Sequence, residues 1–261
     1  MGGKLVREYT NKEWKTLNLK NLNAAISKEV ERVENEYKHE YRNIEVKPED
    51  IANMIDHTLL HAYATEKDVI KLCEEAKDNK FFSVCVNPGM VKISKENLEG
   101  SEVKIATVIG FPLGATSSKS KAEESKIAVS DGADELDMVI NIGWLKARQY
   151  DKVLEDIKAV VKASGDKLVK VIIETCYLDK TEKIAACVLS KMAGAEFVKT
   201  STGFGTAGAT EEDVSLMKFV VGEDMEVKAS GGIRDFEKAS KMVKSGATRI
   251  GASSGIKIIK G

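Results

Sequence analysis

The stretch LVKVIIETCYLDKTEKIAACVLSKMAGAEFVKTSTG, residues 168–203, contains one complete strand–helix–strand unit. Two short runs rich in Val, Ile and Phe flank a longer segment with a helical pattern. Two such strands joined through a helix are typical of parallel neighbours in one sheet. The unit therefore predicts an α/β fold.

The same alternation continues from Ile51 to the end of the chain, and most of the intervening helical segments end near a glycine, which suits a left-handed helix cap. The strand-like runs are NMIDHTLL (53–60), FFSVCVN (81–87), EVKIATVIGFP (102–112), ADELDMVIN (133–141), LVKVIIET (168–175), FVKTSTG (197–203), EVKASGG (226–232) and TRIGASS (248–254). Eight strands separated by helices predict a closed (β/α)8 TIM barrel. An open doubly wound sheet is the alternative, but Leu59, Leu60 and His61 stand where its Gly-rich turn would follow the first strand.

The residues before about Val46 have a different pattern. From Leu19 onward the apolar positions advance in steps of three and four, as in an amphipathic helix, and they are Leu22, Ile26, Val30, Val33, Tyr37 and Tyr41. We predict an N-terminal helical extension over 1–47 and a barrel catalytic domain over 48–261. The helix is expected to pack on the main body and cover one end of it, with a contact between subunits as the alternative.

Composition excludes several classes of protein. The formal net charge is -1 with acidic and basic residues interleaved, which argues against a nucleic-acid partner. No run of about 18 apolar residues exists, so no membrane partner is expected. The first residues lack the apolar segment of a signal peptide. Cys73, Cys85, Cys176 and Cys187 are predicted to be buried free thiols, which favours a cytoplasmic location.

No metal site is predicted, because His39, His57 and His61 lack the spacing of a zinc motif.

Polar residues gather at the carboxyl ends of the predicted strands, where barrel enzymes carry their chemistry. Four of the strands contain a lysine after a valine: Lys104, Lys170, Lys199 and Lys228. Lys104 and Lys170 are expected to point outward or to form ion pairs. Lys199 and Lys228 belong to adjacent strands that run directly into Ser, Thr and Gly.

Two inward lysines at similar height would change each other's pKa. A free lysine has a pKa of about 10.4, so about one in 2,500 is a neutral nucleophile at pH 7. Lowering the pKa to about 7 requires roughly 4.6 kcal/mol. A second ammonium about 6 Å away supplies roughly 2.8 kcal/mol at an effective dielectric of about 20, and desolvation can provide the rest. Such a pair indicates an imine-forming lysine.

A carboxylate on the fourth strand is the expected proton shuttle for that chemistry. In ADELDMVIN, Glu135 and Asp137 share one face, and Asp137 lies deeper in the apolar run. A structural ion pair with Lys170 or Lys199 is the alternative role of Asp137. The Ser- and Gly-rich turns after strands six to eight, with a short helix expected near Ser253, predict an anion site.

Several motifs between about Asp50 and Ile259 together resemble the deoxyribose-phosphate aldolase family: VCVNP, ATVIGFPLG, GADELDMVIN, VKVIIETCYL, FVKTSTGFG, KASGGIR and RIGASSG. The resemblance implies a class I aldolase that reversibly cleaves 2-deoxy-D-ribose 5-phosphate to acetaldehyde and D-glyceraldehyde 3-phosphate in deoxyribonucleotide catabolism, without a metal or other cofactor. It implies that Lys199 forms the imine, Lys228 activates it and Asp137 shuttles the proton. The implied phosphate contacts are Gly203, Gly231, Gly232, Ser253 and Ser254, and Cys85 would lie near the site.

Two features depart from the family pattern. Some members carry a lysine where this chain has Phe204, and some end in a tyrosine that is absent after IKIIKG.

The competing functions are a transaldolase-like enzyme, a phosphosugar isomerase with Asp137 as base, and a non-catalytic phosphate-binding barrel. The expected partners are a phosphosugar substrate and further copies of the chain, as a dimer or tetramer, although the residues alone do not determine the oligomeric state.

Overall fold

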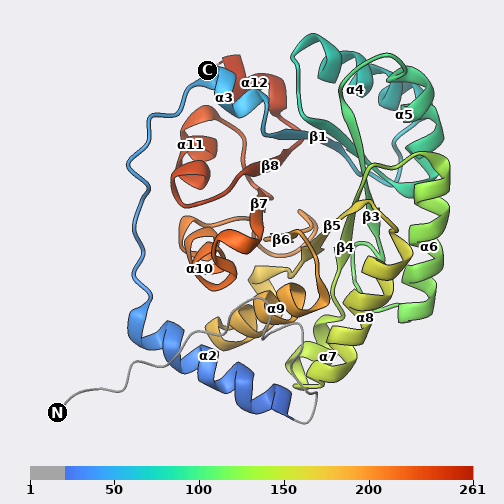
Figure 1. Cartoon of the computed structure of the whole chain (residues 1–261). Helices are drawn as coiled ribbons and strands as arrows, with labels where there is room; N and C mark the ends of the chain where they lie inside the picture. The colour runs from blue at the N-terminus through green and yellow to red at the C-terminus, as the bar shows by residue number, and fades with distance from the viewer. Residues whose placement is uncertain (1–20, 261) are drawn as a thin grey trace.

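Eight parallel strands close into a barrel in the order of the chain, with β1 paired to β8, in the computed structural model, which describes residues 21–260 (Figure 1). The predicted (β/α)8 TIM barrel is therefore confirmed. The strands are β1 (Ile55–Leu59), β2 (Ser83–Val86), β3 (Lys104–Ile109), β4 (Glu135–Val139), β5 (Leu168–Ile172), β6 (Phe197–Lys199), β7 (Glu226–Ser230) and β8 (Arg249–Ala252).

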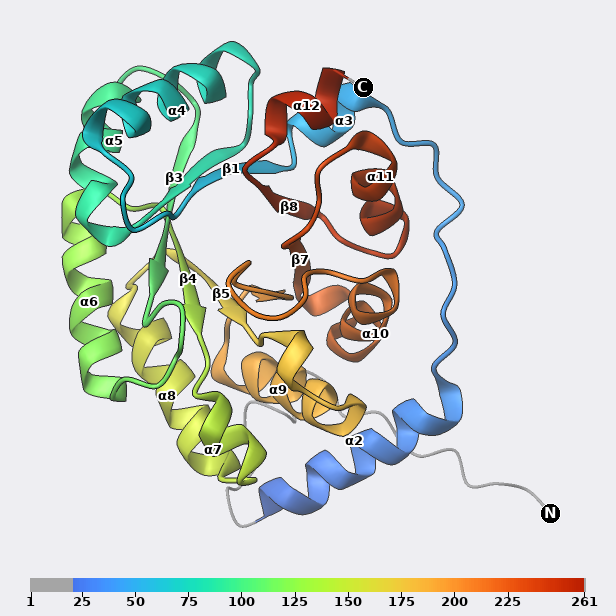
Figure 2. The ribbon, with the colours of Figure 1, turned by 180° about the vertical axis from the view of Figure 1, so that it is seen from behind.

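A ring of helices surrounds the barrel, as Figure 2 shows from behind. They are α3 (Pro48–Ala52), α4 (Glu66–Asp78), α5 (Val91–Asn97), α6 (Ser118–Asp131), α7 (Ile142–Lys146), α8 (Tyr150–Ala163), α9 (Lys180–Ala193), α10 (Glu211–Val221), α11 (Phe236–Lys244) and α12 (Gly255–Lys260). Short 3-10 turns lie at Pro88–Met90, Thr175–Tyr177 and Gly222–Asp224. Local sequence explains the helix ends: Thr65 and Asp68 form a capping box, and Gly194 ends α9 with a φ of 86°.

The apolar core lies mainly between the strands and the helices, with Leu136, Val169 and Val198 among its fully buried residues. Side chains alternate along a strand, so the residues between them face the interior of the barrel. The register puts Asp137 beside Lys170. It also puts Lys199 beside Lys228. The part of the barrel interior that these four residues face is therefore charged rather than apolar.

The N-terminal extension contains helix α2 (Leu22–Glu36), which packs against α9 and α8 on the outside of the helical ring (Figure 1). The prediction that it covers one end of the barrel is wrong. Its predicted C-terminal limit is also wrong, because the backbone becomes extended at Tyr37, whose ring packs edge-on against Phe219 of α10. Tyr41 lies beyond the helix and is 50% exposed. The expected start near Leu19 lies outside the described residues.

Helix α2 is held by apolar and charged contacts. Ile26 and Val33 are buried. Arg32 and Glu29 form a buried ion pair, in which Arg32 Nη2 lies 2.6 Å from Glu29 Oε1. The Arg32 guanidinium also lies 4.9 Å from the centroid of the Phe219 ring. Within residues 21–260, every helix is too short or too polar to cross a bilayer.

Candidate active site

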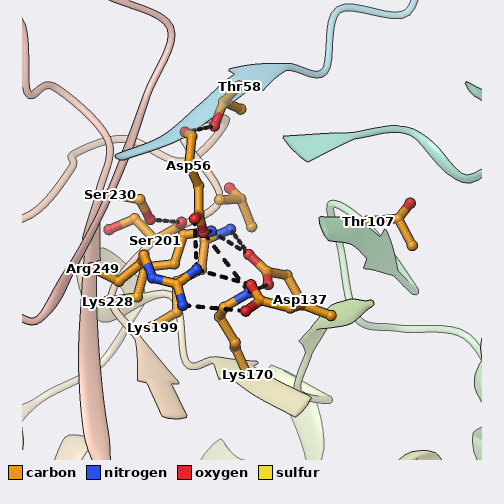
Figure 3. Close-up of polar contacts among 12 residues, drawn as sticks. Asp56, Thr58, Thr107, Asp137, Lys170, Lys199, Ser201, Lys228, Ser230 and Arg249 are labelled. Carbon is orange, nitrogen blue, oxygen red and sulfur yellow. Dashed lines mark hydrogen bonds and ion pairs between the residues drawn. The ribbon is translucent and has the colours of Figure 1, made fainter. Parts of the chain in front are cut away.

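Lys199 and Lys228 both donate to one atom of Asp137 in the barrel interior (Figure 3). Each Nζ lies 2.7 Å from Oδ2 of Asp137, so the two nitrogens are separated by no more than twice that distance. Lys228 and Asp137 are fully buried and Lys199 is 3% exposed. The structure thus brings together the three residues for which the sequence predicts chemistry.

The two lysines have opposite pKa shifts. Burial lowers the pKa of Lys199 and the charge of Lys228 lowers it further, which outweighs the raising effect of Asp137. Burial also acts to lower the pKa of Lys228, but Asp137 and Asp56 outweigh it, so that pKa is raised. For Asp137, burial is outweighed by Lys170, Lys199 and Lys228, which hold its pKa well below the usual range. Lys199 is therefore the amine that most readily becomes neutral.

A second set of buried charges surrounds this trio. Lys170 donates to Glu135 Oε2 at 2.6 Å and to Asp137 Oδ1 at 2.7 Å. Its pKa is raised because the carboxylates, Asp137 foremost, outweigh the lowering effect of burial. Arg249 Nη1 donates to Asp56 Oδ1 at 2.8 Å and to Glu135 Oε2 at 2.9 Å. Lys170 thus forms the ion pairs foreseen for it, whereas Lys104 is exposed.

The charges of this cluster do not balance when every group is ionised. Its cations are Lys170, Lys199, Lys228 and Arg249, and its carboxylates are Asp56, Glu135 and Asp137. An uncompensated buried charge is costly, so the cluster favours the loss of one proton. Within the described chain, Lys199 has one carboxylate partner in this cluster, whereas each other cation has at least two. Lys199 is therefore the cation whose positive charge is least compensated.

Lys199 opens into a pocket of about 310 Å³ at the carboxyl ends of the strands. Of the residues predicted to contact phosphate, Gly203, Gly231, Gly232 and Ser253 line this pocket. Ser254 is half-buried and does not line it, because the chain turns into α12 at Gly255. The pocket therefore has an amine at its base and glycine-rich turns along one side.

Residues at and just after the end of β1, to which sequence reasoning assigned no role, also line the pocket. Thr58, Leu60 and His61 line it from the end of β1 and the loop that follows. Phe204 also lines it and packs edge-on against Phe111, with the ring centroids 5.4 Å apart. A short run of polar residues after a strand is a weak signal for such a wall.

Three of the four cysteines are buried free thiols as predicted, namely Cys73, Cys85 and Cys187. Cys85 is fully buried beside the charged cluster, and burial raises the pKa of its thiol. Cys176 is only half-buried, contrary to the expectation, because it lies on the exposed turn after β5. His57 Nε2 lies 2.7 Å from Glu75 Oε2 on the outer side of β1. No arrangement of three or more His, Cys, Asp or Glu suited to a metal ion occurs between residues 21 and 260.

The sequence pattern of the DeoC/LacD family aldolases matches residues 51–261, which include the whole charged cluster. The chain belongs to the DeoC/LacD family of aldolases. It is 62% identical over 213 residues to a deoxyribose-phosphate aldolase of Thermotoga petrophila, covering 82% of this chain and 86% of that one. The family predicted from the motifs is thereby confirmed.

Solved structures of aldolases share the fold of this DeoC/LacD family member. A structure from Coccidioides immitis, named as a candidate deoxyribose-phosphate aldolase, is 43% identical and superposes with a TM-score of 0.89 over 94% of this chain and 98% of that one. A deoxyribose phosphate aldolase from Aeropyrum pernix, described as a unique tetramer, is 32% identical with a TM-score of 0.77 over 94% and 97% of the two chains. Both similarities extend beyond the matched family region, to nearly the whole chain.

Sequence reasoning missed the contacts of Asp56 and Arg249 in the charged cluster. Asp56 Oδ2 contacts Lys228, and Ser83 donates to its Oδ1 at 2.7 Å. Burial acts to raise the pKa of Asp56, but Lys228, Lys170 and Arg249 outweigh it and hold the pKa below the usual value. The available signal was a charged residue inside a strand, at Asp56 on β1 and at Arg249 on β8.

Arg249→Met is expected to lower the free energy of unfolding by about 3 kcal/mol, because Asp56 and Glu135 would lose a buried partner. The guanidinium also lies 3.5 Å from the centroid of the Phe82 ring. Denaturant unfolding of the Arg249→Met variant and of the unaltered chain measures this difference in free energy. Lys126→Ala is the control, since its pair with Glu123 is exposed, and it should leave stability close to that of the unaltered chain. Equal stability of the Arg249 and Lys126 variants would contradict the prediction.

Proposed function

We propose that this aldolase reversibly cleaves 2-deoxy-D-ribose 5-phosphate to D-glyceraldehyde 3-phosphate and acetaldehyde through a Schiff base on Lys199. The observation that carries the proposal is the placement of two buried lysine nitrogens on one oxygen of Asp137, below a pocket lined by glycine-rich turns. The related proteins from Thermotoga petrophila and Aeropyrum pernix bear the name of this activity.

The reaction begins when neutral Lys199 attacks the aldehyde carbon, C1, of the open-chain sugar. Loss of water from the resulting carbinolamine leaves an iminium ion joined to Nζ. Asp137 lies 2.7 Å from that nitrogen and supplies the acid–base function for the departing hydroxyl. Lys228 remains protonated, because its two carboxylate partners hold its proton.

Cleavage then breaks the bond between C2 and C3. The proton leaves the C3 hydroxyl toward Asp137, the oxygen becomes a carbonyl, and the electron pair of the C2–C3 bond moves into the iminium to form an enamine on Lys199. D-Glyceraldehyde 3-phosphate departs. Protonation of the enamine at C2 and hydrolysis of the imine release acetaldehyde and return the neutral amine, so no outside oxidant or reductant is needed.

The substrate phosphate is proposed to bind the turns after β6, β7 and β8. Glycines at 203, 231 and 232 have φ values of 86°, 86° and 74°, a conformation in which successive backbone N–H groups can converge on an anion. Ser253 adds a hydroxyl donor, and Ser254 is retained in the proposal as a contact made after a small loop movement. Phosphate binding at this end is a recurrent feature of barrels.

The wider biological assignment follows from the same proposal. Residues 1–47 would form an extension to a catalytic barrel of residues 48–261, and the chain would act in the cytoplasm in deoxyribonucleotide catabolism. It would need no cofactor. A dimer or tetramer is proposed because the Aeropyrum pernix relative is described as a tetramer and matches 94% of this chain.

Borohydride reduction in the presence of acetaldehyde tests the covalent step. We expect an ethyl group on Lys199 after peptide mapping and no label in a Lys199→Met variant, and 2-deoxy-D-ribose 5-phosphate used in place of acetaldehyde should label the same lysine. A phosphosugar isomerase or a phosphate-binding barrel would give no adduct. A transaldolase-like enzyme would fail to release acetaldehyde from the five-carbon substrate. Label on another lysine alone would refute the assignment of Lys199.

A further inference from the structure

Glu174 is a buried carboxylate that the mechanism above does not use. It lies two residues after the end of β5 and is 2% exposed. Its backbone has the left-handed conformation, with φ 56° and ψ 68°. That conformation is unfavourable for a residue with a side chain, so the surrounding structure must hold it. Among residues 21–260, its carboxylate is satisfied by hydrogen bonds and not by an ion pair.

Within the described residues, three of the four hydrogen bonds to the Glu174 carboxylate come from Thr202, in the turn after β6, and the fourth comes from the Cys176 thiol, whose Sγ lies 3.9 Å from Oε1. The backbone N–H of Thr202 lies 3.2 Å from Oε1 and 3.3 Å from Oε2, and the Thr202 hydroxyl donates to Oε2. The same hydroxyl oxygen accepts the backbone N–H of Phe204 at 3.0 Å. A carboxylate only accepts hydrogen bonds, so it fixes the direction of the Thr202 proton and leaves a lone pair for Phe204.

The far end of this turn also rests on Glu174. A Cβ atom added to Gly205 would lie 2.8 Å from Cys176 Sγ and 3.3 Å from Glu174 Oε1, so only glycine allows this approach. Glu174 therefore holds the turn by hydrogen bonds at Thr202 and lies, with Cys176, close to its backbone at Gly205. Between these points lie Gly203 and Phe204, which face the pocket that holds Lys199.

We propose that Glu174 is a positioning residue that holds the Thr202–Gly205 turn in the shape that binds the substrate phosphate. This inference rests on the proposed function and adds to it a residue that does not itself line the pocket. Because Glu174 acts on the turn and does not contact Lys199, Asp137 or Lys228 in the structure, its loss should weaken phosphate recognition and spare imine formation.

The test compares Glu174→Gln with the unaltered chain in a phosphate-dependent and a phosphate-free reaction. Glutamine has nearly the same shape, but its amide group donates toward the Thr202 hydroxyl and disturbs the order of donors and acceptors. We expect KM for 2-deoxy-D-ribose 5-phosphate to rise about tenfold, as for the loss of a charge-assisted hydrogen bond, with kcat changed less than about threefold. The acetaldehyde concentration for half-maximal borohydride trapping at Lys199 should stay within about twofold.

Two further variants keep the inference testable if Glu174→Gln fails to fold. Thr202→Val removes the hydroxyl and should raise KM in the same way. Thr202→Ser retains the hydroxyl, so its KM should stay close to that of the unaltered chain. Glu196→Gln is the matched control, because Glu196 accepts the N–H of Val169 at 2.8 Å, at the opposite end of the strands. An unchanged KM in Glu174→Gln or Thr202→Val would overturn the inference, as would an equal loss in acetaldehyde trapping. Failure of the proposed function would appear instead as no cleavage by the unaltered chain.

Discussion

Lys228→Leu is expected to reduce kcat/KM about 100-fold at pH 7. The acidic limb of the pH profile of kcat/KM should also move to higher pH. The Lys228 ammonium lies no more than 5.4 Å, twice 2.7 Å, from the Lys199 nitrogen. At that separation it contributes roughly 3 kcal/mol at an effective dielectric of about 20, which is about two pKa units. In the unaltered chain the charge of Lys228 lowers the pKa of Lys199, so removing that charge raises the pKa. The variant cluster would hold three cations and three carboxylates with Lys199 protonated, and activity should return as the pH is raised.

The pH profile of kcat/KM measures this shift. The fold should survive, because Asp56 retains Arg249 and Asp137 retains Lys170 and Lys199; circular dichroism checks this. Lys104→Leu is the matched control, since Lys104 also follows a valine in a strand but is exposed. An acidic limb at the same pH in the Lys228 variant and the unaltered chain would show that Lys228 does not act through its charge.

Asp137→Asn is expected to lower kcat by about 10²- to 10⁴-fold, the usual contribution of a positioned acid–base group. The asparagine can still accept hydrogen bonds from the lysines, but it cannot take the proton of the C3 hydroxyl. Its effect on Lys199 has the opposite sign to that of Lys228→Leu. Asp137 raises the pKa of Lys199, so removing its charge lowers that pKa. The midpoint of the pH profile for acetaldehyde trapping should therefore move to lower pH while turnover is lost.

For Asp137→Asn, kcat reports the loss of proton transfer, and the pH midpoint of acetaldehyde trapping reports the ionisation of Lys199. Asp134→Asn is the control, because Asp134 precedes β4 and accepts the backbone N–H of Ile105 at 3.0 Å, outside the charged cluster. A kcat within threefold of the unaltered value would exclude Asp137 as the proton shuttle. A trapping midpoint that moves to higher pH would contradict the charge balance proposed for the cluster.

Local patterns were sufficient for most of the fold. The alternation of short β-branched runs with helical segments predicts all eight strands. The local caps agree with it, since the Thr65 and Thr210 side chains accept the backbone N–H of Asp68 and Asp213. The pattern failed for helix α2 at Tyr37. There an apolar residue at the helical spacing packs on Phe219 of a distant helix, and this tertiary contact overrides the local period.

The grouping of Lys199, Asp137 and Lys228 could be predicted in part, because each is a charged residue inside a predicted strand. Their partners could not. Asp56 and Arg249 are 193 residues apart in the chain and meet because β1 pairs with β8. Lys199 and Lys228 both follow a valine in strands that run into Ser, Thr and Gly, and their local sequence does not say which of the two has the lowered pKa.

Taken alone, the order of residues determined the barrel, because apolar periodicity and helix caps act over a few neighbouring positions. Only the tertiary structure decided which lysine gives up its proton. That choice depends on burial and on distances between charges, since Coulomb interactions strengthen as water is excluded and weaken with separation. Closure of the barrel sets these distances: it gives Lys228 two carboxylates and leaves Lys199 with Asp137, beside a second ammonium.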